Sequence, residues 1–320
     1  MHITDIVREA TDKKTPRLAV ELLPPLKGEG TQRIFDALDP LREFSPAYIN
    51  VTYHREDVKY TERENGLLER HTVRRRPGTV GISAAIMKRY GWEVVPHMIC
   101  GGQSRYDIED ALIDLDFLGV HNVLAIRGDN LRGENAFRVH PDGHAHASDL
   151  VRQIDRMNRG VFIDGEVDEC HHSHFCIGVA GYPEKHAEAP NRQEDLRRLK
   201  EKVDAGADYI LTQMSFDNSK IFAFIDDCRA AGITIPIIPG LKPFATKSQL
   251  TMLPQIFHVD LPAELVREVE RCETNAQVRE AGIEWAIAQG RELIAAGIPI
   301  LHFYTMSKTD GIVKIAKALF

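Results

Sequence analysis

The chain has 320 residues, of which 43% are hydrophobic, and its formal net charge is −7 with a pI near 6.1. A net negative charge gives no general attraction to nucleic acid or to an anionic membrane, and we expect neither as a partner. No signal peptide opens the sequence and no apolar run approaches the roughly 20 residues of a membrane span, so we expect a cytoplasmic protein.

Short β-branched, apolar runs alternate along the chain with segments of helical pattern. We predict strands at residues 17–22, 48–53, 93–100, 122–126, 176–180, 209–213, 235–240 and 300–304. Between them, apolar residues recur at helical spacing, as at Ile108, Leu112 and Leu115. Glycines stand where each helix should end, at positions 91, 119, 206, 232 and 297. The alternation predicts an α/β protein with a single (β/α)8 TIM-barrel domain over residues 1–320.

An open, doubly wound sheet is the structural alternative. Such sheets usually carry three glycines directly after the first strand, where they bind phosphate. Here Glu21 and Leu22 are followed by Leu23, Pro24 and Pro25. We therefore favour the closed barrel.

The five cysteines form an odd and sparse set, which indicates a reducing compartment rather than a disulfide framework. Cys170 and Cys176 flank His171, His172 and His174, so five possible metal ligands lie within seven residues. This spacing matches no standard zinc pattern, and Cys176 begins a predicted buried strand. We expect a polar loop followed by a core thiol, and no metal site.

Polar residues at the C-terminal ends of the strands are the candidates for chemistry, because barrel active sites form there. Glu21 ends the first predicted strand within an apolar run, where loss of water would raise its pKa and suit it to act as a general acid. Asp129 follows Arg127, which can neutralise charge, and Gly128, which allows close approach of a ligand. An outward-facing Glu21 and a turn-forming Asp129 are the plain structural alternatives.

Nine short motifs occur in the order and spacing of one known family. They are Val20-Glu21-Leu22-Leu23-Pro24-Pro25, Asn50-Val51-Thr52-Tyr53, Pro96-His97-Met98, Ala125-Ile126-Arg127-Gly128-Asp129, Ala180-Gly181-Tyr182-Pro183-Glu184-Lys185-His186, Lys202-Val203-Asp204-Ala205-Gly206-Ala207-Asp208, Thr212-Gln213, Ile237-Ile238-Pro239-Gly240 and His302-Phe303-Tyr304-Thr305. Together they resemble methylenetetrahydrofolate reductase, a flavin-dependent (β/α)8 barrel, from the first strand to the last.

The resemblance implies an oxidoreductase of one-carbon metabolism and methionine biosynthesis that reduces 5,10-methylenetetrahydrofolate to 5-methyltetrahydrofolate. It implies non-covalent FAD as cofactor and NADH or NADPH as co-substrate, in a ping-pong hydride relay through flavin N5. Glu21 matches the acid that protonates N10 as the five-membered ring opens, in agreement with the raised pKa expected from its apolar run. Asp129 matches the aspartate beside flavin and pterin, where a carboxylate stabilises the developing cation.

Binding roles also follow from the resemblance, residue by residue. The flavin-contacting positions are Thr52, Tyr53, His97, Arg127, Gly128, Asp129, Ala147, Tyr182, His186, Asp195 and Lys202. The positions on the substrate side are Gln213, Gln249, Tyr304 and Lys308. Asp195 and Lys202 also lie on a predicted amphipathic helix, where charges ordinarily face solvent, so a plain surface role stays open for both.

The chain departs from the family pattern at several places. Leu253 stands where an aromatic residue is expected, Lys308 where Arg is expected, and His146 where Tyr is common. Loss of stacking and of a bidentate contact leaves the nucleotide preference and the folate pose open. Residues 156–174 are longer than the resemblance predicts. We expect them to form a rim insertion whose histidines contact the adenine end of the flavin.

Other functions stay open beside this one. A metal-dependent barrel hydrolase or lyase would use Glu21, His97, Asp129 and the histidine cluster as ligands. A flavin- or pterin-binding sensor is disfavoured because a binder needs no proton donor. A reductase of another methylene-pterin carrier would use the same chemistry. The chain ends at Phe320, so we expect no regulatory domain after the barrel, and assembly into a homo-oligomer through the outer helices stays open.

Overall fold

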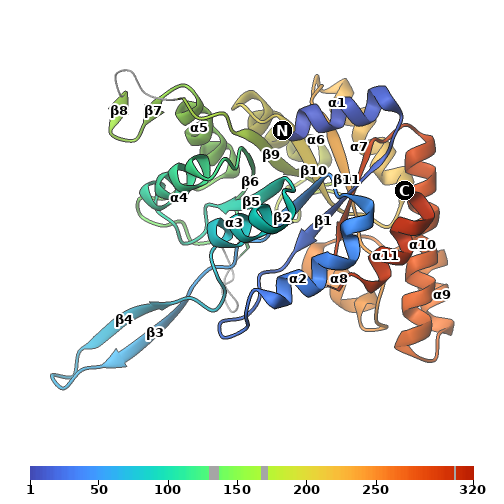
Figure 1. Cartoon of the computed structure of the whole chain (residues 1–320), viewed down its shortest axis with the longest axis horizontal. Coiled ribbons are helices and arrows are strands. Elements are labelled where there is room, and N and C mark those ends of the chain that lie inside the picture. The colour runs from blue at the N-terminus through green and yellow to red at the C-terminus, as the bar shows by residue number, and fades with distance from the viewer. Residues whose placement is uncertain (130–136, 167–171, 306–307) are drawn as a thin grey trace.

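Eight parallel strands close into a barrel (Figure 1). The computed structural model describes residues 1–129, 137–166, 172–305 and 308–320. Around the barrel the strand order is β1-β12-β11-β10-β9-β6-β5-β2, and β1 pairs with both β2 and β12. The predicted barrel is therefore confirmed and the open sheet is wrong. The strands are β1 (Arg17–Leu22), β2 (Tyr48–Val51), β5 (Val94–Ile99), β6 (Asn122–Ile126), β9 (Cys176–Gly181), β10 (Tyr209–Met214), β11 (Ile237–Leu241) and β12 (Ile300–Tyr304).

Helices surround the barrel and connect successive strands. Several of them begin where a side chain caps a free backbone N–H group, as at Ser104, whose hydroxyl accepts from the Asp107 N–H at 3.1 Å. None of the described helices is both long and apolar enough to cross a membrane. The helical elements are α1 (Ile3–Lys13), α2 (Gln32–Leu38), the 3-10 helix η1 (Asp39–Phe44), α3 (Thr79–Tyr90), α4 (Arg105–Phe117), α5 (Ala147–Asn158), α6 (Arg192–Asp204), α7 (Asn218–Ala230), α8 (Gln249–Phe257), α9 (Ala263–Arg271), α10 (Asn275–Ala295) and α11 (Asp310–Leu319).

Strand alternation divides the core into an outer shell and a barrel interior. In β1, Leu18, Val20 and Leu22 belong to the large cluster beneath the surrounding helices, whereas Ala19 packs with Tyr48 in a separate inner cluster. Successive strand residues point to opposite faces. Glu21 therefore lies on the same side as Ala19, two residues nearer the C-terminal end of the barrel.

Helix α1 closes the N-terminal end of the barrel. Ile3 and Ile6 are buried in the inner cluster, and the Ile3 N–H donates to Asn122 Oδ1 at 2.9 Å. Figure 1 shows α1 lying across this end, away from the loops that follow the strands. The opposite, C-terminal rim is left for chemistry.

Two antiparallel hairpins were not predicted. The hairpin β3 (Asp57–Glu62) and β4 (Leu68–Val73) follows β2 and projects from the body (Figure 1). The second, β7 (Val161–Phe162) and β8 (Gly165–Glu166), follows α5. Neither interrupts the barrel, because both lie within connections between consecutive barrel strands.

Candidate active site

Glu21 and Asp129 lie at the same rim of the barrel. Glu21 is the penultimate residue of β1, in register with Asn50 of β2 and Tyr304 of β12. Asp129 follows the end of β6 and is exposed. Its charge raises the pKa of Glu21 and also that of Tyr182, so Asp129 lies within electrostatic reach of both. The structure thus brings the two carboxyl groups together at the C-terminal rim, where the sequence placed them.

The Glu21 carboxyl is held in a nearly dry environment. Its side chain is 13% exposed, and burial raises its pKa to about 7. The ammonium of Lys242 acts in the opposite direction, and Asp129 adds a smaller rise. The Thr305 hydroxyl donates to the Glu21 backbone carbonyl at 2.6 Å, which joins the end of β1 to the end of β12. A carboxyl with this pKa is protonated in a substantial fraction of molecules at neutral pH.

His97 lies below Glu21 as a neutral side chain. Its Nε2 is 3.8 Å from Glu21 Oε2, but burial, with a smaller effect of His54, lowers the pKa of His97 to about 3. The contact is therefore not an ion pair. Asn50 Nδ2 donates to His97 Nε2 at 3.2 Å, which leaves the ring proton on Nδ1. His97 thus contacts the Glu21 carboxyl as a neutral ring. It does not line the pocket described next.

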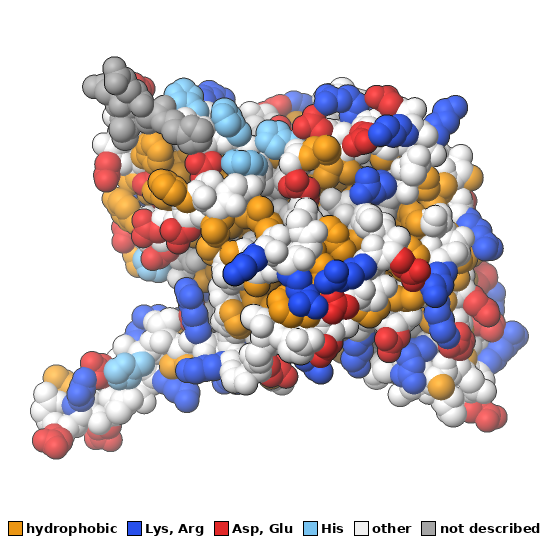
Figure 2. Space-filling model, viewed as in Figure 1, with side chains coloured by type: hydrophobic (Ala, Val, Ile, Leu, Met, Phe, Trp, Pro, Cys, Tyr) orange, Lys and Arg blue, Asp and Glu red, His pale blue; other side chains and the backbone are white. Residues whose placement is uncertain are grey.

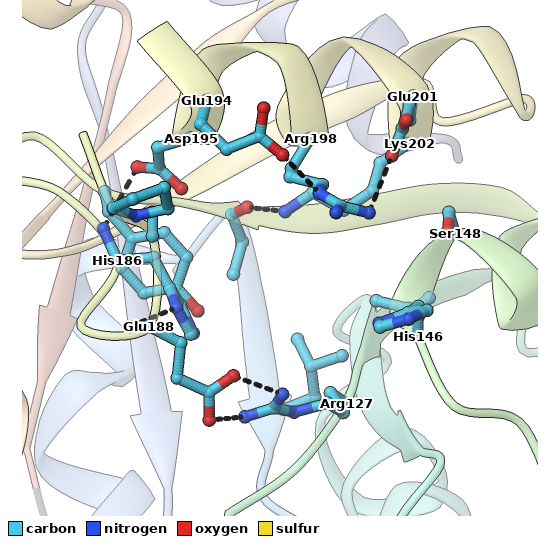
Figure 3. Close-up of a pocket in the computed structure, with 17 residues that line it drawn as sticks. Arg127, His146, Ser148, His186, Glu188, Glu194, Asp195, Arg198, Glu201 and Lys202 are labelled. Carbon is cyan, nitrogen blue, oxygen red and sulfur yellow. Dashed lines mark hydrogen bonds and ion pairs between the residues drawn. The ribbon is translucent and has the colours of Figure 1, made fainter. Parts of the chain in front are cut away.

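A pocket opens beside these groups, between β6, β9, the start of α5 and one side of α6 (Figure 3). It encloses about 260 Å³, a little below the roughly 300–1,000 Å³ of typical small-molecule sites, so it suits one part of a large ligand. Six of the predicted cofactor-binding residues line it, namely Arg127, Ala147, Tyr182, His186, Asp195 and Lys202. Barrel closure therefore brings together residues that are far apart in the sequence. Their binding role stays a prediction.

Lys202 is a buried cation at the back of this pocket. Its Nζ donates to the Ala180 carbonyl at 2.5 Å and lies 5.9 Å from the centre of the Tyr182 ring. Burial lowers the pKa of Lys202 to about 8, and the nearby Asp195 offsets part of this effect. The side chain therefore points inward from α6, and the alternative that it faces solvent is wrong.

Arg127 closes the opposite side of the pocket in an ion pair with Glu188. Its Nη1 and Nη2 donate to the two carboxylate oxygens at 2.6 and 2.7 Å (Figure 3). Arg198, on α6, is paired with Glu194 at 3.0 Å. With Lys202, these side chains provide three cations around one pocket, and the carboxylates balance them.

The loop after β9 is shaped by Asp195 and His186. Asp195 Oδ2 accepts from the His186 backbone N–H at 3.0 Å, and the His186 ring meets the Tyr182 ring edge-on with centroids 4.7 Å apart. These contacts hold the Tyr182 ring at the pocket wall. Asp195 therefore faces the pocket, and the plain surface role is wrong for it as well.

The remaining predicted cofactor residues lie at the rim but do not line the pocket. The Thr52 hydroxyl donates to the Leu22 carbonyl at 3.4 Å. The Tyr53 hydroxyl accepts from Gln103 Nε2 at 3.1 Å, and burial raises the pKa of Tyr53 to about 12. Gly128 has φ +85°, where a side chain would be strained and its Cβ would lie 3.3 Å from Ile99. Cofactor contact for these residues stays a prediction.

The predicted substrate-side residues are partly engaged in local contacts. Gln249 Oε1 accepts from the Ala245 N–H at 2.7 Å, so mainly its amide nitrogen is left for a ligand. Gln213 Oε1 likewise accepts from the adjacent Met214 N–H at 3.0 Å. The Tyr304 hydroxyl donates to the Thr212 carbonyl at 2.6 Å, which leaves its ring at the rim.

Two of the departures from the family pattern differ in their surroundings. Leu253 is fully buried in a cluster with Phe216 and Phe244, and the effect of this departure on ligand stacking stays a prediction. Lys308 is exposed, and a contact with substrate stays a prediction.

The prediction that histidines of the 156–174 insertion contact the flavin is wrong for the described residues of this segment. Helix α5 runs from the pocket to the N-terminal end of the barrel, where Asn158 Nδ2 donates to the Phe175 carbonyl at 2.9 Å. His174 lies close enough to His121, just before β6, to lower the pKa of that ring. The described residues of the insertion thus lie at the end of the barrel opposite the pocket. Cys170 and His171 lie outside the described residues.

Comparisons with known proteins identify the family. The family model described as methylenetetrahydrofolate reductase matches residues 6–320. The chain belongs to the methylenetetrahydrofolate reductase family. The resemblance of the nine motifs is therefore confirmed, and the match covers the barrel together with the hairpins that were not predicted.

Relatives in this family come from fungi, plants and bacteria. Methylenetetrahydrofolate reductase 1 of Schizosaccharomyces pombe is 31% identical, covering 100% of this chain and 48% of the relative. Methylenetetrahydrofolate reductase (NADH) 1 of Arabidopsis thaliana is 29% identical over 96% of this chain and 49% of the relative. The 5,10-methylenetetrahydrofolate reductase of Escherichia coli is 29% identical over 92% of this chain and 87% of the relative. The chain thus spans about half the length of the yeast and plant relatives.

A solved structure shares the fold. It is an uncharacterized protein from Clostridium thermocellum that binds two copies of 5-methyl-5,6,7,8-tetrahydrofolic acid, with a TM-score of 0.57 and 14% identity over 98% of both chains. At this identity the likeness supports the barrel architecture alone.

The structure of this family member adds residues that sequence reasoning did not assign. Lys242 follows β11, its side chain is largely buried, and its Nζ donates to the Tyr304 carbonyl at 3.4 Å. Burial lowers the pKa of Lys242, and the nearby Glu21 counteracts part of this. A lysine directly after the apolar run Ile237–Leu241 was the available signal. Glu188 and Arg198 carried no such signal, because surface charges are common in loops and on helices.

Proposed function

We propose that the chain reduces 5,10-methylenetetrahydrofolate to 5-methyltetrahydrofolate, with non-covalent FAD as cofactor and NADH or NADPH as electron source. The observation that carries this proposal is the buried Glu21 carboxyl, with a pKa of about 7, at the rim of a barrel of this family. A neutral acid at this position is what ring opening of the folate requires at neutral pH.

The donor set of the pocket fits a flavin dinucleotide. Arg127, Arg198 and Lys202 supply cations suited to a diphosphate, and the Tyr182 ring offers a flat surface. The Asp195 carboxylate is suited to hydroxyl groups of a ribose or ribitol. When bound, a flavin accepts a hydride from a nicotinamide and delivers it to an acceptor. Binding of the diphosphate here would compete with Glu188 for Arg127.

Glu21 holds the proton that the folate needs. The five-membered ring of the substrate opens when N10 becomes protonated, and a carboxylic acid kept neutral by burial donates this proton readily. Neutral His97 beneath it adds no positive charge that would favour the carboxylate. Lys242 limits the rise of the pKa, so the acid still titrates near neutrality. Glu21 can therefore both donate a proton and recover one.

Asp129 serves a different purpose because it is exposed and carries its charge at the rim. A carboxylate here accepts hydrogen bonds from a pterin edge and stabilises the positive charge that develops as the ring opens. The two acids thus have separate environments and separate roles. One is buried and the other is exposed to solvent.

The nicotinamide and the folate would use one face of the site in turn, which gives ping-pong kinetics. The Arabidopsis relative is named for NADH. Separate titrations with NADH and with NADPH would identify the donor of this chain. A metal-dependent hydrolase receives no support from the placed side chains, since no group of three or more His, Cys, Asp or Glu suited to a metal ion occurs within the described ranges.

Anaerobic visible spectroscopy of the purified chain tests the proposal. We expect a flavin spectrum that bleaches with NADH or NADPH and returns when methylenetetrahydrofolate is added. In Glu21→Gln, bleaching should keep its rate, whereas return of colour should slow by about 10²–10⁴-fold. A chain that binds no flavin, or a variant that regains colour at the normal rate, would contradict the proposal.

A further inference from the structure

Helix α4 carries an apolar stripe on its outer side. Ile108, Leu112 and Leu115 face the barrel and are fully buried. On the other side Tyr106 is 49% exposed, Ile113 36% and Phe117 89%. Their spacing of seven and four residues places these three side chains on one face, which we call the α4 stripe. A surface helix ordinarily presents polar side chains to water, so an outward apolar face indicates a contact surface.

The β3–β4 hairpin carries a second apolar surface. Opposite residues of an antiparallel pair share a face, and one face of this hairpin holds the pairs Val58–Thr72, Tyr60–Arg70 and Glu62–Leu68. Tyr60 is 63% exposed and Leu68 67%. We call this surface the arm face. An isolated two-stranded hairpin is at best marginally stable in water, so an arm with this composition is expected to be covered by a partner.

On the other side of the hairpin, charged side chains pair with each other. Glu69 pairs there with Arg63, and His71 Nε2 lies 3.0 Å from Glu69 Oε2. On the arm face, by contrast, Arg70 makes no ion pair with any described residue. The hairpin is thus polar and internally paired on one side, whereas the arm face presents Tyr60 and Leu68 beside the polar residues Glu62, Arg70 and Thr72.

The two sides of the hairpin are joined to each other at its base, and the segment after β4 contacts the loop that follows β1. Arg74 Nε donates to Glu56 Oε1 at 2.9 Å, and Arg75 pairs with Asp57. The Lys27 N–H also donates to the Arg75 carbonyl at 2.7 Å. These contacts set the direction of the arm, and Figures 1 and 2 show that it stands clear of the body on the side where α4 lies. The arm face therefore does not cover the α4 stripe of its own chain.

We propose that the arm face of one protomer packs on the α4 stripe of a second copy, and the reverse, in a two-fold dimer. The lengths agree, since thirteen helical residues and six strand residues each span about 20 Å. A two-fold axis forms the contact twice and leaves neither surface exposed, which doubles the buried area and closes the assembly.

Charge complementarity supports a second copy as the partner. Residues 57–76 contain six basic and four acidic residues, whereas α4 contains five acidic residues and one basic residue. Asp110 and Asp114 are exposed beside the α4 stripe and make no ion pair with the rest of the described chain. In the dimer, Arg70 of the arm meets these carboxylates across the interface. Opposite charges at the edge of the interface favour the contact between the arm face and α4 over other contacts between two copies.

Sedimentation analysis of the full chain tests the proposal. We expect a mass of twice 36.1 kDa for the wild type and of 36.1 kDa for Phe117→Glu and for Leu68→Glu. Ile256→Glu is the matched control, because Ile256 is 58% exposed on α8, outside both surfaces, and it should remain a dimer. All these side chains face water in the monomer, so the circular dichroism spectrum and the melting of a folded monomer should be retained.

A charge exchange identifies the partner surface directly. Arg70→Glu should weaken the dimer at least tenfold, and Asp110→Arg with Asp114→Arg added in the same chain should restore it. A monomeric wild type, or a dimer that persists in both Phe117→Glu and Leu68→Glu, would overturn the proposal. Failure of the exchange to restore the dimer would also count against it. None of these measurements depends on the reaction, so they succeed or fail separately from the proposed function.

Discussion

The side chains of Lys242 and Glu21 stabilise each other's charged forms at the barrel rim. Burial raises the pKa of Glu21 to about 7 and lowers that of Lys242, and each charge partly reverses the shift of the other. The acid therefore titrates near neutrality because two opposing effects are balanced. Lys242 directly follows β11, whereas Glu21 is the penultimate residue of β1, so only the closed barrel brings the two together.

Replacement of Lys242 tests this balance. Without its positive charge, the pKa of Glu21 should rise further, by about one pH unit in Lys242→Met. An acid catalyst works in its protonated form, so the decline of the folate half-reaction at alkaline pH should move upward by the same amount. The pH profile of anaerobic flavin reoxidation by methylenetetrahydrofolate measures this. Lys317→Met, on the surface of α11, is the control, and an unchanged profile in Lys242→Met would show that the two groups are not coupled.

Glu21 should also lower the stability of the chain as pH rises. In the unfolded chain a Glu ionises near pH 4.5, whereas the folded pKa is about 7, so folding favours the protonated form. The cost grows as pH increases from about 4.5 to 7 and reaches about 3 kcal/mol above that range. Glu21→Gln, which has no charge to bury, should be more stable than the wild type at pH 8 and similar at pH 4.5. Urea unfolding at both values decides this, and a difference independent of pH would refute it.

Lys202 should make flavin binding depend on pH. With a pKa of about 8 in the free chain, it loses its positive charge above that pH, and attraction for a diphosphate weakens. FAD affinity of the wild type should fall between pH 7 and 9. Lys202→Met should bind FAD at least about tenfold more weakly at pH 7 and lose this pH dependence. Lys200→Met, on the same helix but paired with Asp204 at the surface, should behave as the wild type in a fluorescence titration.

Gly178 should be intolerant of any side chain because the barrel interior has no room for one. A Cβ at this position would lie 2.3 Å from the Tyr209 ring, which is itself fully buried. Gly178→Ala should therefore lower the free energy of unfolding by about 1–3 kcal/mol. Gly30→Ala is the matched control, since no atom lies within 4 Å and its φ is not positive. Equal stability of the two variants in urea unfolding would contradict this prediction and show that the Tyr209 ring moves aside at little cost.

Local pattern was sufficient to predict the barrel strands. The bounds of β1, β6 and β12 agree fully with the prediction, and the others differ by one to a few residues at either end. The β3–β4 hairpin was missed because Glu62 and Arg70 interrupt the apolar residues of the arm face, which leaves no clear period of two. Helix α1 was missed because it lies before the first strand, outside the repeating unit. The nine motifs indicated Glu21, Asp129 and part of the pocket lining, but no motif pointed to Lys242.

The sequence by itself determined the (β/α)8 architecture, the family and the rim at which the two acids lie, since strand alternation and the C-terminal ends of parallel strands are local properties. Only the tertiary structure decided that Lys202 points into the pocket and that His174 lies at the far end of the barrel. It alone placed Lys242 within reach of Glu21 and the arm face away from its own α4. Burial and the distances between charges depend on how distant segments pack, and a linear pattern carries no information about either.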